Sequence, residues 1–142
     1  MRVPGAQACE AARLASGLAD EEVFLLMAAE GHGKSKSLGV FDERVLRRPS
    51  VAKPLDSRGT SVDSVIKALL NREYFLRAGR GRLSKSPEGS CVEHVFNDVW
   101  EDMILRNQVD RFAETKLDRI GVIRDHLRAI CVQWQQASKG YV

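Results

Sequence analysis

The segment whose spacing comes closest to a known chemistry is residues 28–35, Ala-Ala-Glu-Gly-His-Gly-Lys-Ser. It nearly matches a phosphate-binding loop, in which glycine amides surround the phosphates and a lysine neutralises their charge. The first glycine of that pattern is Ala28 here, and Lys34 leads into a stretch interrupted by glycine and proline, with no alternation of strands and helices after it. We therefore expect a flexible loop here and no nucleotide cofactor.

Cysteines and histidines could form a metal site only if two helices brought them together. Cys91 and His94 are three residues apart and share a helical face, whereas His126 and Cys131 are five apart, about 140° around a helix. Ligands placed in this way do not readily converge on tetrahedral zinc. No nucleophile has a general base at a suitable spacing either. The expectation is a protein without metal, cofactor or enzymatic activity.

A local excess of basic residues follows the middle of the chain. Glu73 alone opposes Arg72, Arg77, Arg80, Arg82 and Lys85. Together with Tyr74 and Phe75 these cations could hold single-stranded nucleic acid, because cations contact phosphates and aromatic rings stack on bases. The whole chain has 22 basic and 19 acidic residues, in near balance in each third, so a globally basic nucleic-acid binder is not indicated. A solvated loop is the simpler interpretation.

Ser50 is a candidate phosphorylation site. Arg47 and Arg48 precede it by three and two residues, a pattern that basic-directed kinases recognise. Its place in a stretch without periodic structure motivates this hypothesis.

Length and composition predict one soluble domain. The chain has 142 residues, of which 44% are hydrophobic and 29% charged, close to ordinary globular usage. Its apolar runs fall far short of the roughly 20 residues that a membrane helix needs. The three cysteines, at positions 9, 91 and 131, are odd in number and widely spaced, which predicts free thiols in a reducing, cytoplasmic compartment.

The chain divides into three parts by pattern. Residues 1–30 are expected to hold two short helices, at 6–18 and 20–29. Residues 31–59 contain four glycines and two prolines without a sustained period, which predicts an irregular, extended connector. Residues 60–137 are expected to form a helical interaction domain.

That domain shows three stretches of helical apolar spacing. The first spans residues 61–76, the second begins with Ser90 as its N-cap, and the third spans about residues 112–136. Glycines and serines between the first two predict a loop at 78–90. The expected fold class is all-α, a helical hairpin or small bundle with an irregular, extended N-terminal half.

Two of these helices resemble a known family. Residues 122–135, with the Arg124-Asp125 step, resemble the arginine–aspartate helix of the axonemal dynein light-chain family, the inner-arm light chains. Residues 95–106 are similar to the helix that precedes it in that family, and residues 61–82 to the helix and basic turn before that. The resemblance implies a non-enzymatic subunit bound to an inner-arm dynein heavy chain, in the axoneme of a cilium or flagellum and thus cytoskeletal.

Apolar residues of the last two helices are the expected partner-binding site: Trp100, Ile120, Ile123, Leu127, Ile130 and Trp134. An exposed apolar seam is what partner helices dock against, and tryptophans dominate such interfaces. The partner would be the heavy chain or another axonemal subunit, with a homodimer as a further option. Two alternatives stay open: a microtubule-associated axonemal structural protein, and a small nucleic-acid-binding protein that uses the basic stretch at 72–85.

Overall fold

The computed structural model describes residues 3–30, 39–110 and 115–139. Its helices are α1 (Gly5–Ala15), α2 (Asp20–Ala28), α3 (Pro49–Asp56), α4 (Val62–Asn71), α5 (Pro87–Leu105) and α6 (Ile120–Lys139). Two short 3₁₀ helices, η1 (Glu43–Arg47) and η2 (Leu117–Arg119), precede α3 and α6. Three strands complete the described part: β1 (Phe41–Asp42), β2 (Phe75–Arg77) and β3 (Arg82–Lys85). The predicted helical character is confirmed.

The small sheet corrects the all-α expectation. Its strands are antiparallel in the order β1-β3-β2, with Phe41 opposite Leu83 and Phe75 opposite Lys85. Phe41, Phe75 and Leu83 are buried, and the two rings meet edge to face at 5.9 Å. The expected loop at 78–90 therefore contains β3 and the first turn of α5. Strands this short leave little alternating pattern in the sequence.

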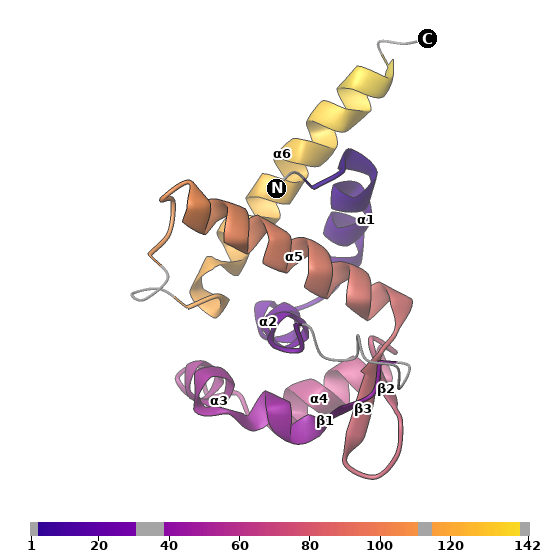
Figure 1. Cartoon of the computed structure of the whole chain (residues 1–142), viewed down its shortest axis with the longest axis vertical. Coiled ribbons are helices and arrows are strands. Elements are labelled where there is room, and N and C mark those ends of the chain that lie inside the picture. The colour runs from indigo at the N-terminus through magenta and orange to yellow at the C-terminus, as the bar shows by residue number, and fades with distance from the viewer. Residues whose placement is uncertain (1–2, 31–38, 111–114, 140–142) are drawn as a thin grey trace.

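The central helix α5 begins earlier than expected. Ser86, not Ser90, is its N-cap, and the Ser86 hydroxyl accepts a hydrogen bond from the Gly89 amide at 3.1 Å. Pro87 occupies the first helical position, where its missing N–H is not needed. The predicted apolar stripe is buried along the helix. In Figure 1, α5 crosses the middle of the molecule. Helices α1 and α6 lie above it, and α3, α4 and the sheet lie below it.

The predicted extended connector is wrong for residues 39–59, which hold β1, η1 and α3. Leu46, Val51 and Leu55 from this segment are buried in the same hydrophobic cluster as the later helices. Pro49 begins α3 at its first position, and a second proline lies inside this helix. Two prolines in eight residues are not typical of a helix, so the sequence pattern did not predict one here. The helix is stabilised by its buried side chains. Residues 31–38 lie outside the described residues.

Helices α1 and α6 pack side by side, and α6 extends beyond the body of the molecule (Figure 1). Cys9 and Cys131 form a disulfide across this contact, with 4.9 Å between their Cα atoms. The expectation of three free thiols is thus wrong for two of them. A separation of 122 residues gives no sequence signal for the pairing, which follows from the packing of the two helices.

Candidate nucleic-acid interface

Helices α3 and α4 form a helix-turn-helix. After α3 ends, the Thr60 amide bonds to the Leu55 carbonyl at 3.0 Å and the Gly59 amide to the Asp56 carbonyl at 2.9 Å. Gly59 has a φ of 70°, the left-handed conformation that this type of helix end requires. Ser61 then caps α4 by accepting a hydrogen bond from the Ser64 amide at 3.1 Å. A short turn with glycine between two packed helices also occurs in DNA-binding helix-turn-helix units.

Helix α4 has one buried and one exposed face. Its apolar residues, Val62, Val65, Ile66 and Leu69, lie in the core. Its exposed residues are all polar: Asp63, Ser64, Lys67 and Asn71. The four recur at helical spacing and so form one polar stripe along the helix. This stripe is free to contact another molecule.

Strands β2 and β3 form a hairpin beside α4 that carries three of the arginines predicted as a basic patch. Arg77, Arg80 and Arg82 are exposed on it. The loop between the strands is closed by a hydrogen bond from the Ala78 amide to the Arg82 carbonyl at 3.1 Å. Gly79 and Gly81 take positive φ angles of 129° and 68° in this loop. The hairpin lies at one end of the molecule (Figure 1).

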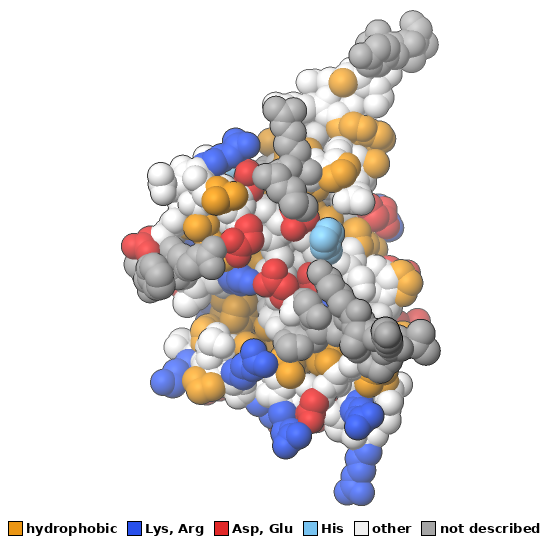
Figure 2. Space-filling view, viewed as in Figure 1, with side chains coloured by type: hydrophobic (Ala, Val, Ile, Leu, Met, Phe, Trp, Pro, Cys, Tyr) orange, Lys and Arg blue, Asp and Glu red, His pale blue; other side chains and the backbone are white. Residues whose placement is uncertain are grey.

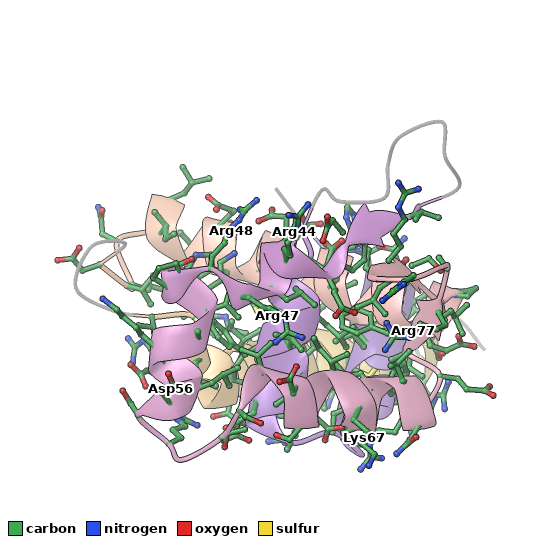
Figure 3. All side chains as sticks on the ribbon, turned by 90° about the horizontal axis from the view of Figure 1, so that it is seen from below. Arg44, Arg47, Arg48, Asp56, Lys67 and Arg77 are labelled. Atoms are coloured by element: carbon green, nitrogen blue, oxygen red, sulfur yellow. A yellow bond between two sulfur atoms is a disulfide. The ribbon has the colours of Figure 1, made fainter. Side chains whose placement is uncertain are left out.

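The charge of the chain is concentrated in this region. Residues 39–85 contain 11 basic and 5 acidic residues, whereas the other residues contain 11 basic and 14 acidic ones. On the face seen in Figure 2, most Lys and Arg side chains lie at the lower end of the molecule and most acidic ones lie across its middle. We call the exposed cations at this end the basic face: Arg44, Arg47, Arg48, Lys67, Arg77, Arg80 and Arg82. Five of them are labelled in Figure 3, which views this end from below.

A chain of ion pairs links the hairpin to α4 across the basic face. Arg77 donates to Glu43 at 2.9 Å, Arg47 lies 3.4 Å from the same carboxylate, and Arg47 also donates to Asp63 at 2.5 Å. The hydrogen bond to Asp63 raises the pKa of the Arg47 guanidinium. Neither Lys67 nor Arg80 forms an ion pair within the part of the chain that the structure describes, so both are available to an anionic partner.

Asp42 and Arg44 form a separate pair at the edge of this face. Arg44 donates to the Asp42 carboxylate at 2.7 Å through its side chain and at 2.9 Å through its backbone amide. These hydrogen bonds lower the pKa of the Asp42 carboxyl below its usual value. Both groups therefore remain charged at neutral pH.

The other two residues of the predicted patch, Arg72 and Lys85, form ion pairs with residues of α2 and α5. Arg72 donates to Glu22 at 2.9 Å. Lys85 is buried, forms an ion pair with the buried Glu93, and donates to the Ala29 carbonyl at 2.9 Å. The patch expected over residues 72–85 thus divides into three exposed arginines on the hairpin and two cations that stabilise the fold.

Most of the expected partner-binding residues lie inside the protein. Trp100, Ile120, Ile123 and Leu127 are buried in its own hydrophobic core. Ile130 is partly buried against that core, and 44% of Trp134 remains exposed near the end of α6. The structure therefore does not bring the six together as an open seam.

Ser50 is exposed in the first turn of α3. It borders an open cavity of about 840 Å³ whose lining also includes Arg48, Lys53, Trp100 and Lys116. Its phosphorylation stays a prediction. Of the phosphate-loop pattern, Ala28 is the last residue of α2, and residues 31–35 lie outside the described residues.

The two cysteines considered above as zinc ligands do not come together in the structure. Cys131 is bonded to Cys9, and Cys91 is a free, half-buried cysteine whose burial raises the pKa of its thiol. Among the described residues, no group of three or more Cys, His, Asp or Glu side chains could hold a metal ion.

Sequence reasoning missed the helix-turn-helix, although its signals are present. Pro49 stands where a helix begins, Val51 and Leu55 are four residues apart, and Gly59 and Ser61 mark a helix end and the next cap. The charge excess was hidden because dividing the chain into equal thirds separates Arg44 and Arg47 from the hairpin arginines. A window over residues 39–85 would have found it.

No helix in the described ranges combines the length and the apolar character needed to cross a bilayer. Comparison of the chain with protein-family models, with curated proteins and with solved structures finds no match.

Proposed function

We propose that this protein binds double-stranded DNA through the helix-turn-helix and the hairpin beside it. The observation that carries the proposal is that the polar stripe of α4, the arginines of η1 and the basic hairpin lie at the same end of the molecule, where ion pairs join the hairpin through η1 to α4. In helix-turn-helix proteins the second helix lies in the major groove and its N-terminal residues contact base edges, while the first helix crosses the backbone. Helix α4 has the length and the polar surface for this position.

The hairpin supports the same function. Strand β2 of the hairpin lies against α4. The three hairpin arginines would contact phosphates or the neighbouring minor groove when the helix lies in the major groove. The succession of helix, strand, helix-turn-helix and hairpin in α2–β1–α3–α4–β2–β3, with the strand order β1-β3-β2, is similar to the arrangement of a winged helix. The hairpin corresponds to the wing in this architecture.

Duplex DNA fits the basic face better than a single strand. Single-strand binding relies on exposed aromatic rings that stack on bases. Phe75 is completely buried, and Tyr74 is partly buried with its hydroxyl donating to the Leu14 carbonyl at 3.3 Å. These two rings, which the sequence suggested as stacking groups, are therefore used by the fold, while the cations remain exposed.

Binding to an axonemal dynein heavy chain stays a prediction with less support. It depended on an apolar seam along the last two helices, and four of its six residues lie in the core. The alternative of nucleic-acid binding depended on the basic stretch at 72–85, and the three hairpin arginines of that stretch are exposed. For this reason DNA binding is the preferred function.

The test is fluorescence anisotropy with a labelled duplex of mixed sequence over a salt series. The variant Lys67→Ala/Arg80→Ala/Arg82→Ala should bind at least tenfold more weakly, and its plot of log K against log salt should be shallower by about one for each lost phosphate contact. The matched control, Arg13→Ala/Arg106→Ala/Arg128→Ala, removes three exposed arginines elsewhere on the molecule. Circular dichroism establishes that both variants fold.

The control should retain affinity within about twofold, apart from the small nonspecific effect of net charge. If both variants lose the same DNA affinity, the binding reflects the net charge of the protein and not the basic face. Absence of salt-dependent binding by the unmodified protein at low salt would overturn the proposed function.

A further inference from the structure

We propose that Asp63 and Lys67 are the residues of α4 that determine DNA sequence preference, with Arg47 holding the Asp63 carboxylate in place. Asp63 would accept a hydrogen bond from the exocyclic amine of a cytosine, and Lys67 would donate to the O6 and N7 atoms of a guanine. The inference rests on the proposed function and adds to it the class of sequence that is bound.

The positions of these residues on α4 suit contact with base edges. Asp63 lies in the first turn of the helix, and Lys67 and Asn71 follow one and two turns later on the same ridge. With a rise of about 1.5 Å per residue, Asp63 and Lys67 are separated by about 6 Å along the helix axis. Base pairs are stacked about 3.4 Å apart, so the two side chains would contact positions roughly two base pairs apart.

The chemistry of the two side chains selects different bases. In the major groove a carboxylate finds a donor only on the amino groups of cytosine and adenine, and it pairs preferentially with the N4 amine of cytosine. A lysine finds two acceptors, O6 and N7, on a guanine. The Asp63 side chain is 75% exposed, and Lys67 forms no ion pair in the described ranges, so both are accessible before DNA arrives.

Arg47 explains how a carboxylate can stand on a DNA-binding surface. An isolated Asp63 would be repelled by the phosphates on both sides of the groove. The Arg47 guanidinium donates to Asp63 at 2.5 Å and offsets that charge. Arg47 is in turn held by Glu43, which also pairs with Arg77 of the hairpin. The carboxylate is thereby fixed to η1 and, through Glu43, to the hairpin before binding.

The other polar residues of the stripe are less suited to this role. The Ser64 hydroxyl donates to the Ser61 carbonyl at 2.8 Å, so it already has a partner within the helix end. Asn71 is the last residue of α4, farthest from the N-terminal part that contacts base edges in helix-turn-helix units. Asp63 and Lys67 remain as the exposed groups in the first two turns of the helix.

The experiment is selection of bound duplexes from a randomised library, followed by sequencing, with the unmodified protein and three variants. The unmodified protein should enrich sites with a cytosine and a guanine about two positions apart. Asp63→Asn should change the preference at the cytosine position to adenine by about tenfold, because an amide pairs with N6 and N7 of adenine. Lys67→Ala should lose the guanine preference. The control Arg128→Ala, which removes an exposed cation of α6 away from the basic face, should leave the selected sequence unchanged.

Each outcome bears on the proposal. An enriched sequence that Asp63→Asn does not alter would overturn it. Salt-dependent binding of duplexes with no enriched sequence would also overturn it, while the proposed function would stand. Failure to retain any duplex at low salt would overturn both.

Discussion

The guanidinium of Arg124 joins the last helix to the start of α2: its Nε lies 3.1 Å from Oδ1 of Asp20. The same side chain donates to the carbonyl oxygens of Ala15 at 2.7 Å and Leu18 at 2.9 Å. One arginine thus satisfies three acceptors at the corner between α1 and α2. Asp125, the next residue, is exposed and pairs with Arg128 in its own helix. The Arg124-Asp125 step, which suggested a family resemblance, has a structural role here.

Replacing Arg124 by alanine should lower the free energy of unfolding by about 2–4 kcal/mol, because hydrogen bonds to a charged group contribute about 1.5–3 kcal/mol each and their effects overlap. Urea unfolding followed by circular dichroism measures the change. The control Arg128→Ala, with a side chain 71% exposed, should change stability by less than about 0.5 kcal/mol. Similar values for the two variants would contradict this role.

The disulfide between Cys9 and Cys131 should make a large contribution to stability. In the chain-entropy model, closing a loop with a sequence separation of 122 residues stabilises the folded state by up to about 5 kcal/mol. The variant Cys9→Ser/Cys131→Ser should therefore unfold at a clearly lower urea concentration than the oxidised protein. Cys91→Ser, which leaves the bridge intact, is the control. Titration of the unfolded, unreduced protein should find one thiol; three thiols would show that the bridge does not form.

The pair of Lys85 and Glu93 should behave as part of the core and not as part of the proposed DNA-binding surface. Lys85→Ala leaves the buried Glu93 carboxylate without its cation, which costs about 3–5 kcal/mol. Replacing both residues, Lys85→Met with Glu93→Leu, should recover most of that loss. Arg82→Ala, at an exposed position, should leave stability nearly unchanged while weakening DNA binding. A DNA defect in Lys85→Ala without destabilisation would contradict this assignment.

Two glycines with open space around them should respond oppositely to alanine. An added Cβ at Gly59 or Gly121 meets no atom within 4 Å. Gly59 has a left-handed φ of 70°, so Gly59→Ala should destabilise the turn by about 1 kcal/mol. Gly121 lies in α6 with ordinary helical geometry, so Gly121→Ala should stabilise the protein by about 0.5–1 kcal/mol. Thermal unfolding of both variants measures the two signs, and a stabilising Gly59→Ala would contradict the turn geometry.

Helical periodicity predicted the larger helices because each buries a regular apolar stripe. The segments expected at 61–76 and from 90 onward correspond to α4 and α5, with differences at their ends. Periodicity did not predict α3, because this helix has two prolines in eight residues. It did not predict the sheet either, because the longest strand has only four residues. These elements form because neighbouring side chains such as Phe41 and Leu46 are buried in the shared core. Such tertiary stabilisation is invisible in a local pattern.

The candidate site was only partly predictable for a related reason. The hairpin arginines were noticed as a cluster because they are close in sequence. Arg47 and Asp63 are 16 residues apart, and their pairing depends on how η1 approaches α4. Lys85 looked equivalent to Arg82 in the sequence. Side chains along a strand alternate between its two faces, so positions 82 and 85 point to opposite faces, and Lys85 pairs with Glu93 of α5. Sequence gives the charges, and the fold decides which of them are exposed.

The bond between Cys9 and Cys131 has a consequence for any protease that cuts this chain. A single cleavage at any peptide bond from residue 9 to residue 131, including one in the hairpin loop, produces two fragments that stay covalently attached. Such a nicked molecule would migrate as one band on a denaturing gel and separate only when a thiol reagent is added. Electrophoresis without reductant would consequently overlook a cut in the hairpin of the basic face.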